Sequence, residues 1–267
     1  SNYEPVKEAA IQLINECGPV TGLLHEAELL IAKEINKHMP NVEMFRMLGS
    51  GTEACMVAAR IARLKTGKKN ILKMGGAYHG WSDQLAYGMR VPGTKGMMSK
   101  GVPNFVFKHT DEFFPNDLED LERKLRRNQL TGGTAAIYVE PMGPESGTRP
   151  VSKEFIKGVE ALAHKYGALL IFDEVVTGFR IGPSGAQGYF GVDPDLTVFG
   201  KRLDAVIGCE ESAFTVGDRN GDDVADFALG KPRGLVGCDS GTDDAGLVAA
   251  DGVERQRRAG FIGVDDL

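Results

Sequence analysis

The chain has 267 residues, 42% of them hydrophobic and 25% charged, which is ordinary for a globular protein that buries a sizeable core. Its net charge of -6, without a basic cluster interleaved with aromatic residues, argues against nucleic acid as a partner. No apolar run is long enough to span a bilayer, and four scattered cysteines without a CxxC pair favour reduced thiols, a cytoplasmic protein and no zinc site.

Segments with helical spacing alternate with short apolar runs over the first three quarters of the chain. The spacing predicts helices at residues 4–16, 24–38, 53–65, 117–127 and 152–166. It predicts strands at 44–48, 70–74, 105–107, 135–139, 168–172 and 196–199. Strands that alternate with helices indicate an α/β fold, with a mainly parallel sheet flanked by helices.

Two of these predicted strands each lead to one ionisable residue. The run 168–172 ends at Asp173, and the run 196–199 leads through Gly200 to Lys201, 28 positions after Asp173. The carboxyl ends of buried parallel strands are where such sheets carry their chemistry. An acid and a lysine so placed suit a pyridoxal-phosphate (PLP) enzyme. The carboxylate keeps the pyridine nitrogen protonated, and the amine holds the aldehyde as a Schiff base.

Other chemistries have weaker support in the sequence. Residues 169–174 also fit a Walker B strand, but that interpretation requires an upstream GxxxxGK[ST] motif, which the sequence lacks. Residues 25–29 come close to an HExxH zinc motif and lack its second histidine, so the sequence predicts no metal site.

Two further positions are candidates for the same site. Ser50-Gly51-Thr52 lies between a predicted strand and a helix, where backbone N–H groups, the helix dipole and two hydroxyls make a phosphate cradle. The alternative is a plain polar turn before a helix. Glu140 ends a predicted strand before Pro141, where it is either a cofactor-site acid or a solvated loop acid.

Taken together, these motifs resemble the class III aminotransferases, which are fold type I PLP enzymes. The segments that carry the resemblance are 50–54, 78–80, 140–145, 172–180 and 194–201, in that order. The resemblance covers residues 1–201 and is closest to the glutamate-1-semialdehyde 2,1-aminomutase-like branch, which the segment 185–191 favours. Trp81 stands where members of that branch usually have histidine.

The resemblance implies a role for each candidate residue. Tyr78 would stack on the pyridine ring, Val175 would pack on its other face, and Glu140 would approach the 3-hydroxyl side or gate the substrate site. Lys201 and Asp173 would be the catalytic residues. The implied cofactor-binding residues are Ser50, Gly51, Thr52, Tyr78, His79, Glu140, Asp173, Val175 and Lys201.

The resemblance also implies PLP-dependent amino-group transfer on a small amino-acid or amino-aldehyde substrate, in a homodimer. Aminomutase-like activity is the first expectation. The alternatives are a class III transaminase for another ω- or β-amino acid, or a non-catalytic remnant that only binds PLP.

The composition changes near residue 202. Residues 1–201 hold 24 basic and 23 acidic residues, whereas residues 202–267 hold 7 and 14. Arg202-Leu203-Asp204 stands where the family has a glycine-rich turn after the lysine, and we expect the family's small domain and usual N-terminal segment to be missing from this sequence. We therefore expect a truncated, incomplete PLP-binding large domain at 1–201. The rest is expected to be an atypical, poorly ordered tail, frameshifted or fused.

Overall fold

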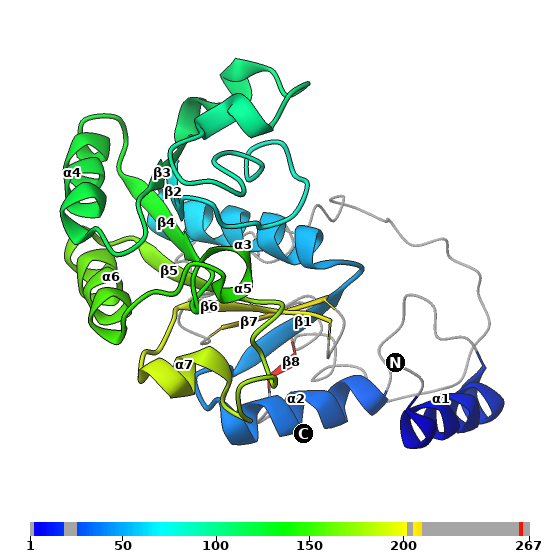
Figure 1. The fold of residues 1–267 in the computed structure, drawn as a ribbon. Helices are drawn as coiled ribbons and strands as arrows, with labels where there is room; N and C mark the ends of the chain where they lie inside the picture. The colour runs from blue at the N-terminus through cyan, green and yellow to red at the C-terminus, as the bar shows by residue number, and fades with distance from the viewer. Residues whose placement is uncertain (1–2, 19–25, 202–204, 210–261, 264–267) are drawn as a thin grey trace, which may run out of the picture.

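The computed structural model describes residues 3–18, 26–201, 205–209 and 262–263, and it has a sheet with helices on both faces (Figure 1). The α-helices are α1 (Glu4–Cys17), α2 (Glu26–His38), α3 (Gly51–Thr66), α4 (Leu118–Gln129), α5 (Pro144–Gly147), α6 (Lys153–Tyr166) and α7 (Gly185–Phe190). The strands are β1 (Met44–Leu48), β2 (Asn70–Met74), β3 (Thr110–Phe113), β4 (Thr134–Val139), β5 (Leu169–Glu174), β6 (Leu196–Phe199), β7 (Ala205–Cys209) and β8 (Ile262–Gly263).

The strands lie in the order β3-β2-β4-β5-β6-β7-β1-β8. The first five are parallel to one another, which confirms the predicted mainly parallel sheet. Strand β7 is antiparallel to both β6 and β1, so β1 runs in the same direction as β6. The carboxyl ends of β1, β2, β4, β5 and β6 therefore meet at one edge of the sheet.

Alternation along the strands divides the core into two layers, because successive side chains of a strand point to opposite faces. Tyr138 and Ile171 pack on the face covered by α3. Ile137 and Phe172, their chain neighbours, pack on the face covered by α4, α6 and α7 (Figure 1). All four side chains are fully buried, which explains why these strands appear in the sequence as continuous apolar runs.

The helix boundaries follow from capping. Ser50 precedes α3 and its Oγ accepts a hydrogen bond from the Glu53 amide at 3.2 Å, while Gly67 ends the helix in the left-handed conformation. Ser152 caps α6 in the same way, as the sequence predicts, and Gly167 ends it. Among the described residues, no helix is both long and apolar enough to cross a membrane.

The strand predicted at residues 105–107 is wrong. These residues lie in a 3-10 helix, η2 (Asn104–His109), that follows Pro103, and Phe105 is 77% exposed. The edge strand β3 comes immediately afterwards and has the polar sequence Thr-Asp-Glu-Phe. Its Glu112 is buried because it accepts hydrogen bonds from the amides of Gly93 and Lys95, at 2.9 and 2.6 Å. An apolar pattern cannot reveal such a strand.

Most of the predicted tail lies outside the described residues. The parts of it that the structure describes are β7, which lies between β6 and β1, and β8, which pairs with β1. The division of the chain at residue 201 stays a prediction, as does the frameshifted or fused origin of residues 202–267. The source gene would test that origin: a family match in another reading frame after codon 201 would support a frameshift, and its absence would exclude the frameshift and leave the fusion.

A buried lysine fixes the loop that follows β2. The Lys73 side chain is fully buried, and its Nζ donates hydrogen bonds to the carbonyl oxygens of Ala77 and Leu85 at 2.8 and 3.0 Å. Burial lowers the pKa of Lys73 to about 8, although nearby acids such as Glu112 and Glu140 raise it in part. Lys73 thus closes the loop in which Tyr78 and His79 lie.

Because its pKa is lowered, Lys73 should make the stability of the fold depend on pH. Its folded-state pKa of about 8 is below the usual 10.5, so the unfolded chain binds more protons between these values. The free energy of unfolding should therefore rise with pH across this window, by up to about 1.4 kcal/mol per pH unit from this group. Urea unfolding of the wild-type chain and of Lys73→Met at pH 8, 9 and 10 measures the difference in slope. Lys157→Met, at an exposed lysine of α6, should keep the wild-type slope; an unchanged slope in Lys73→Met would contradict the prediction.

Candidate active site

The predicted site residues converge on the carboxyl edge of the sheet. Ser50 follows β1, Tyr78 lies in the loop after β2, Glu140 follows β4, Asp173 lies near the end of β5 and Lys201 follows β6. A cavity of about 360 Å³ opens at this edge. All nine predicted site residues line it: Ser50, Gly51, Thr52, Tyr78, His79, Glu140, Asp173, Val175 and Lys201.

Asp173 is the most constrained of these side chains and is 7% exposed. Its Oδ2 accepts a hydrogen bond from Nδ1 of His79 at 2.8 Å and faces the Cys55 thiol at 3.6 Å. Its Oδ1 accepts from the Val175 amide at 3.1 Å. A carboxylate offers about four lone-pair positions, so one acceptor position remains for a group in the cavity. His79 is a positioning residue in this arrangement, because its ring fixes the carboxylate.

Cys55 is a site residue that the sequence reasoning missed. It lies one helical turn after Thr52 in α3, so both side chains lie on the same helix face. The three-residue spacing from Thr52, in the predicted phosphate cradle, could have identified Cys55 from the sequence. Burial and the neighbouring Asp173 raise the pKa of the Cys55 thiol well above its usual value, so it stays protonated and can donate.

Cys55, His79 and Asp173 also have potential metal-ligand atoms within 4.8 Å of one another. A thiol binds a metal as the thiolate, which the raised pKa of Cys55 disfavours. The thiol and Nδ1 of His79 both face the same oxygen, Oδ2 of Asp173. These contacts account for the cluster as a hydrogen-bonded support for the carboxylate.

The cradle is closed by two glycines that pack against site residues. A Cβ on Gly51 would lie 3.0 Å from Cγ2 of Val175. Gly80 has φ +90°, and a Cβ there would lie 2.7 Å from Cα of Thr52. The loop after β2 therefore lies directly against the start of α3, which brings Tyr78 and the cradle into one cavity.

Gly80 provides a test of this close approach. Gly80→Ala combines a left-handed backbone with a clash against the Thr52 backbone, so we expect a loss of about 2–4 kcal/mol in the free energy of unfolding. Gly101→Ala is the matched control: Gly101 has φ +98°, and no atom lies within 4 Å of the added Cβ. It should cost about 1 kcal/mol from the backbone alone. Urea unfolding measures both, and equal losses would show that the contact with Thr52 is unimportant.

The remaining predicted residues border the same cavity. Glu140 is 8% exposed, and its Oε1 accepts a hydrogen bond from the Tyr78 amide at 2.6 Å, so it holds the aromatic segment in place and is not a solvated loop acid. Tyr78 is 44% exposed and forms an edge-to-face pair with Trp81, with ring centroids 6.1 Å apart. Lys201 has φ +54° and an exposed side chain at the cavity wall.

Glu174 supports the site from the opposite face of β5. Its carboxylate is fully buried and accepts hydrogen bonds from the amides of Ala186 and Gln187 and from the Thr177 hydroxyl, at 2.7, 3.1 and 3.0 Å. Burial raises the pKa of Glu174, although these hydrogen bonds oppose that effect. These hydrogen bonds connect the turn after β5 to α7. They therefore hold the end of β5, where Asp173 and Val175 lie, in a fixed position.

The cavity fits PLP on three observations. Its volume lies in the usual range of small-molecule sites, about 300–1,000 Å³. The amides at the start of α3, with the Thr52 hydroxyl, suit a phosphate, and the Ser50 hydroxyl lies beside them, where it caps the helix and donates to Oε2 of Glu53 at 3.3 Å. Asp173 retains an acceptor position for a ring N–H, and Lys201 brings an amine to the same cavity.

This fold is that of the large domain of fold type I PLP-dependent transferases. An omega-transaminase from Sphaerobacter thermophilus superposes with a TM-score of 0.70 at 28% identity, over 83% of this chain and 53% of that one. A glutamate-1-semialdehyde-aminomutase from Pseudomonas aeruginosa, in complex with PMP, has a TM-score of 0.65 at 26% identity, over 79% of this chain and 47% of that one.

The chain belongs to the class III aminotransferase family, whose model matches residues 3–216. It is 41% identical over 201 residues to a glutamate-1-semialdehyde 2,1-aminomutase of Syntrophobacter fumaroxidans, covering 74% of this chain and 46% of the relative. It is 44% identical over 204 residues to a glutamate-1-semialdehyde 2,1-aminomutase of Bacillus licheniformis, covering 75% of this chain and 46% of that relative. The chain thus spans about half the length of the curated relatives it matches, and the matched range continues past Lys201.

Proposed function

We propose that the chain binds PLP in the 360 Å³ cavity and takes part in amino-group transfer of the glutamate-1-semialdehyde 2,1-aminomutase type. The observation that carries this proposal is the convergence of an amine, a supported buried carboxylate and a helix N-terminus on one cavity. When bound, PLP supplies an electron sink that stabilises negative charge on the substrate carbon.

Each residue has a task in this proposal. The amides at the start of α3 and the hydroxyls of Ser50 and Thr52 hold the phosphate. Asp173, held by His79 and Cys55, accepts a hydrogen bond from the ring nitrogen and keeps it protonated. Lys201 would hold the cofactor aldehyde, and its amine would move the proton at the reacting carbon of the substrate.

Tyr78 and Val175 restrict the ring from its two sides. Tyr78 is held by its amide contact with Glu140, and Val175 packs against Gly51 at the cradle. The first contact fixes the backbone of Tyr78, and the second supports the position of the Val175 side chain. A ring held between two such side chains presents a fixed face to the substrate, which limits the bond that can be broken.

The aminomutase assignment rests on the two named aminomutase relatives, which are 41% and 44% identical to this chain over 46% of their own length. Incubation of the PLP-loaded chain with glutamate 1-semialdehyde, without any added oxo-acid, tests it. The expected product is the isomer that carries the amino group on the adjacent carbon, detected by proton NMR.

Two other outcomes would overturn this assignment. Product formation only when a 2-oxo acid is added would indicate a transaminase for another ω- or β-amino acid. PLP binding without turnover of either kind would indicate that this chain only retains the cofactor site. Homodimer formation belongs to the same proposal, and sedimentation of the PLP-loaded chain measures it.

A further inference from the structure

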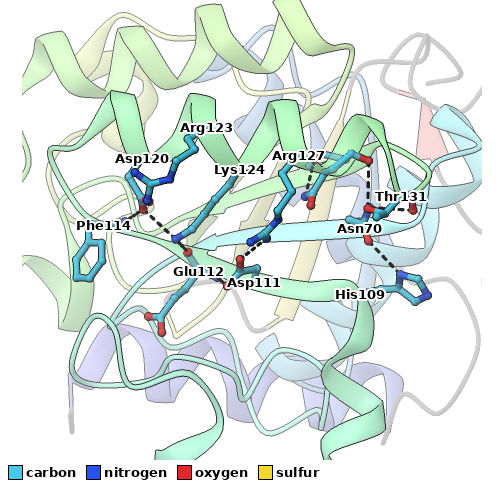
Figure 2. Close-up of polar contacts among 12 residues, drawn as sticks. Asn70, His109, Asp111, Glu112, Phe114, Asp120, Arg123, Lys124, Arg127 and Thr131 are labelled. Atoms are coloured by element: carbon cyan, nitrogen blue, oxygen red, sulfur yellow. Dashed lines mark hydrogen bonds and ion pairs between the residues drawn. The ribbon is translucent and has the colours of Figure 1, made fainter.

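A second cavity lies away from the PLP site, at the amino ends of β2 and β3. Its volume is about 410 Å³, and its wall includes the starts of both strands, the end of α4, the 3-10 helix η2 and the loop after β2. Figure 2 shows part of this wall, with Asn70, His109, Asp111, Arg127 and Thr131 grouped around the strand starts. Since β2 and β3 are parallel, this is the edge of the sheet opposite to the carboxyl ends.

The cavity wall is strongly basic. Lys95, Lys108, His109 and Arg127 line it, and Asp111 is the single acid among its lining residues in the described part of the chain. Asp111 is already paired, because its Oδ2 lies 2.6 Å from a guanidinium nitrogen of Arg127 (Figure 2). Lys95 and Lys108 have no carboxylate within ion-pair distance among the described residues.

The hydrogen bond between His109 and Asn70 fixes which ring nitrogen of His109 carries the proton. Asn70 donates through Nδ2 to the carbonyl oxygen of Gly133 at 2.8 Å, so its Oδ1 is an acceptor. Nδ1 of His109, 3.0 Å from that Oδ1, must therefore donate (Figure 2). Burial and the cations Lys108, Arg63 and Lys69 lower the pKa of His109, so the neutral form of its ring is favoured.

Two more residues of the cavity wall, Lys95 and Tyr87, are held in place by their surroundings. Lys95 has φ +50°, a costly backbone conformation for lysine, and its amide is held by Glu112 at 2.6 Å. Tyr87 packs on Phe107 with ring centroids 5.0 Å apart, and burial, with Asp111 and Glu112 nearby, raises its pKa to about 12. Its phenol therefore stays a hydrogen-bond donor at neutral pH.

We propose that this second cavity binds the phosphate group of a small phosphorylated molecule, at a site separate from the PLP cradle. Two lysines without carboxylate partners balance the charge of a phosphate dianion, and the Tyr87 hydroxyl adds a neutral donor. Several donors around one cavity suit the tetrahedral oxygens of phosphate better than a planar carboxylate.

Equilibrium dialysis with labelled inorganic phosphate at low ionic strength tests the site on the PLP-loaded full chain. With PLP in the cradle, we expect one further phosphate per chain, with a Kd of about 1 mM or tighter. The double variant Lys95→Gln/Lys108→Gln should weaken this binding by about 10-fold or more. The control Lys153→Gln/Lys157→Gln removes the same charge from α6 and should leave the Kd unchanged.

Competition experiments with two other anions identify the chemistry of the ligand. Glycerol phosphate should compete with the labelled phosphate, whereas acetate at the same ionic strength should not. Equal competition by acetate would overturn the proposal, as would equal loss in the two double variants, because either result indicates attraction by net charge alone. Thr52→Val, in the cradle, should leave the Kd at the second cavity unchanged; a loss there would mean that the measured phosphate occupies the PLP cradle.

Discussion

Replacing Lys201 by alanine should abolish amino-group transfer and remove the covalent attachment of PLP to the chain. Lys201 is the lysine that lines the 360 Å³ cavity in the described part of the chain, and Lys73 is engaged with two carbonyl oxygens. Loss of its proton transfer alone should reduce kcat by about 10²–10⁴-fold. The measurement is borohydride reduction of the PLP-loaded chain, followed by mapping of the modified peptide by mass.

Lys100→Ala is the control, because Lys100 is exposed and does not line the cavity. The wild-type chain and Lys100→Ala should both carry the reduced label on Lys201. PLP absorbance after gel filtration should persist at lower occupancy in Lys201→Ala, since the cradle and Asp173 remain. Label spread over several lysines in the wild-type chain would contradict the assignment of Lys201.

Asp173→Asn should lower kcat by about 10²–10³-fold, with a smaller loss of stability than Asp173→Ala. The amide oxygen can still accept the hydrogen bond from Nδ1 of His79, but the amide nitrogen then replaces the acceptor of the Val175 N–H, and the negative charge proposed to face the ring nitrogen is lost. Asp173→Ala removes the acceptor for both His79 and Cys55, and should cost about 1–3 kcal/mol in the free energy of unfolding as well. Urea unfolding and steady-state kinetics separate the two effects.

The neighbouring acid makes a matched control for this experiment. Glu174 is on the same strand, is buried and does not line the cavity, so Glu174→Gln should lower stability through the contacts to α7. Its kcat per folded molecule should stay within a few-fold of wild type. If Glu174→Gln and Asp173→Asn lose the same activity, the role of Asp173 at the ring nitrogen is refuted.

Much of the fold followed from local patterns. The cap residues Ser50, Ser152 and Gly67 act on their own helix, so their effect is visible in a short window of sequence. The prediction of a strand at residues 105–107 was wrong because a short run of apolar residues does not distinguish a strand from a 3-10 helix. Strand β3 was missed because its buried Glu112 is stabilised by amides 17 and 19 residues away.

By itself, the sequence determined most of the strands and helices up to residue 201 and nine of the residues that line the 360 Å³ cavity. It could do so because the carboxyl ends of parallel strands must share one edge, which brings Asp173 and Lys201 together. Only the tertiary structure decided how Asp173 is supported, since His79 and Cys55 are 94 and 118 residues away in sequence. The same holds for Lys73 and for the basic cavity at the opposite edge, because burial and the spacing of charges depend on contacts between distant segments.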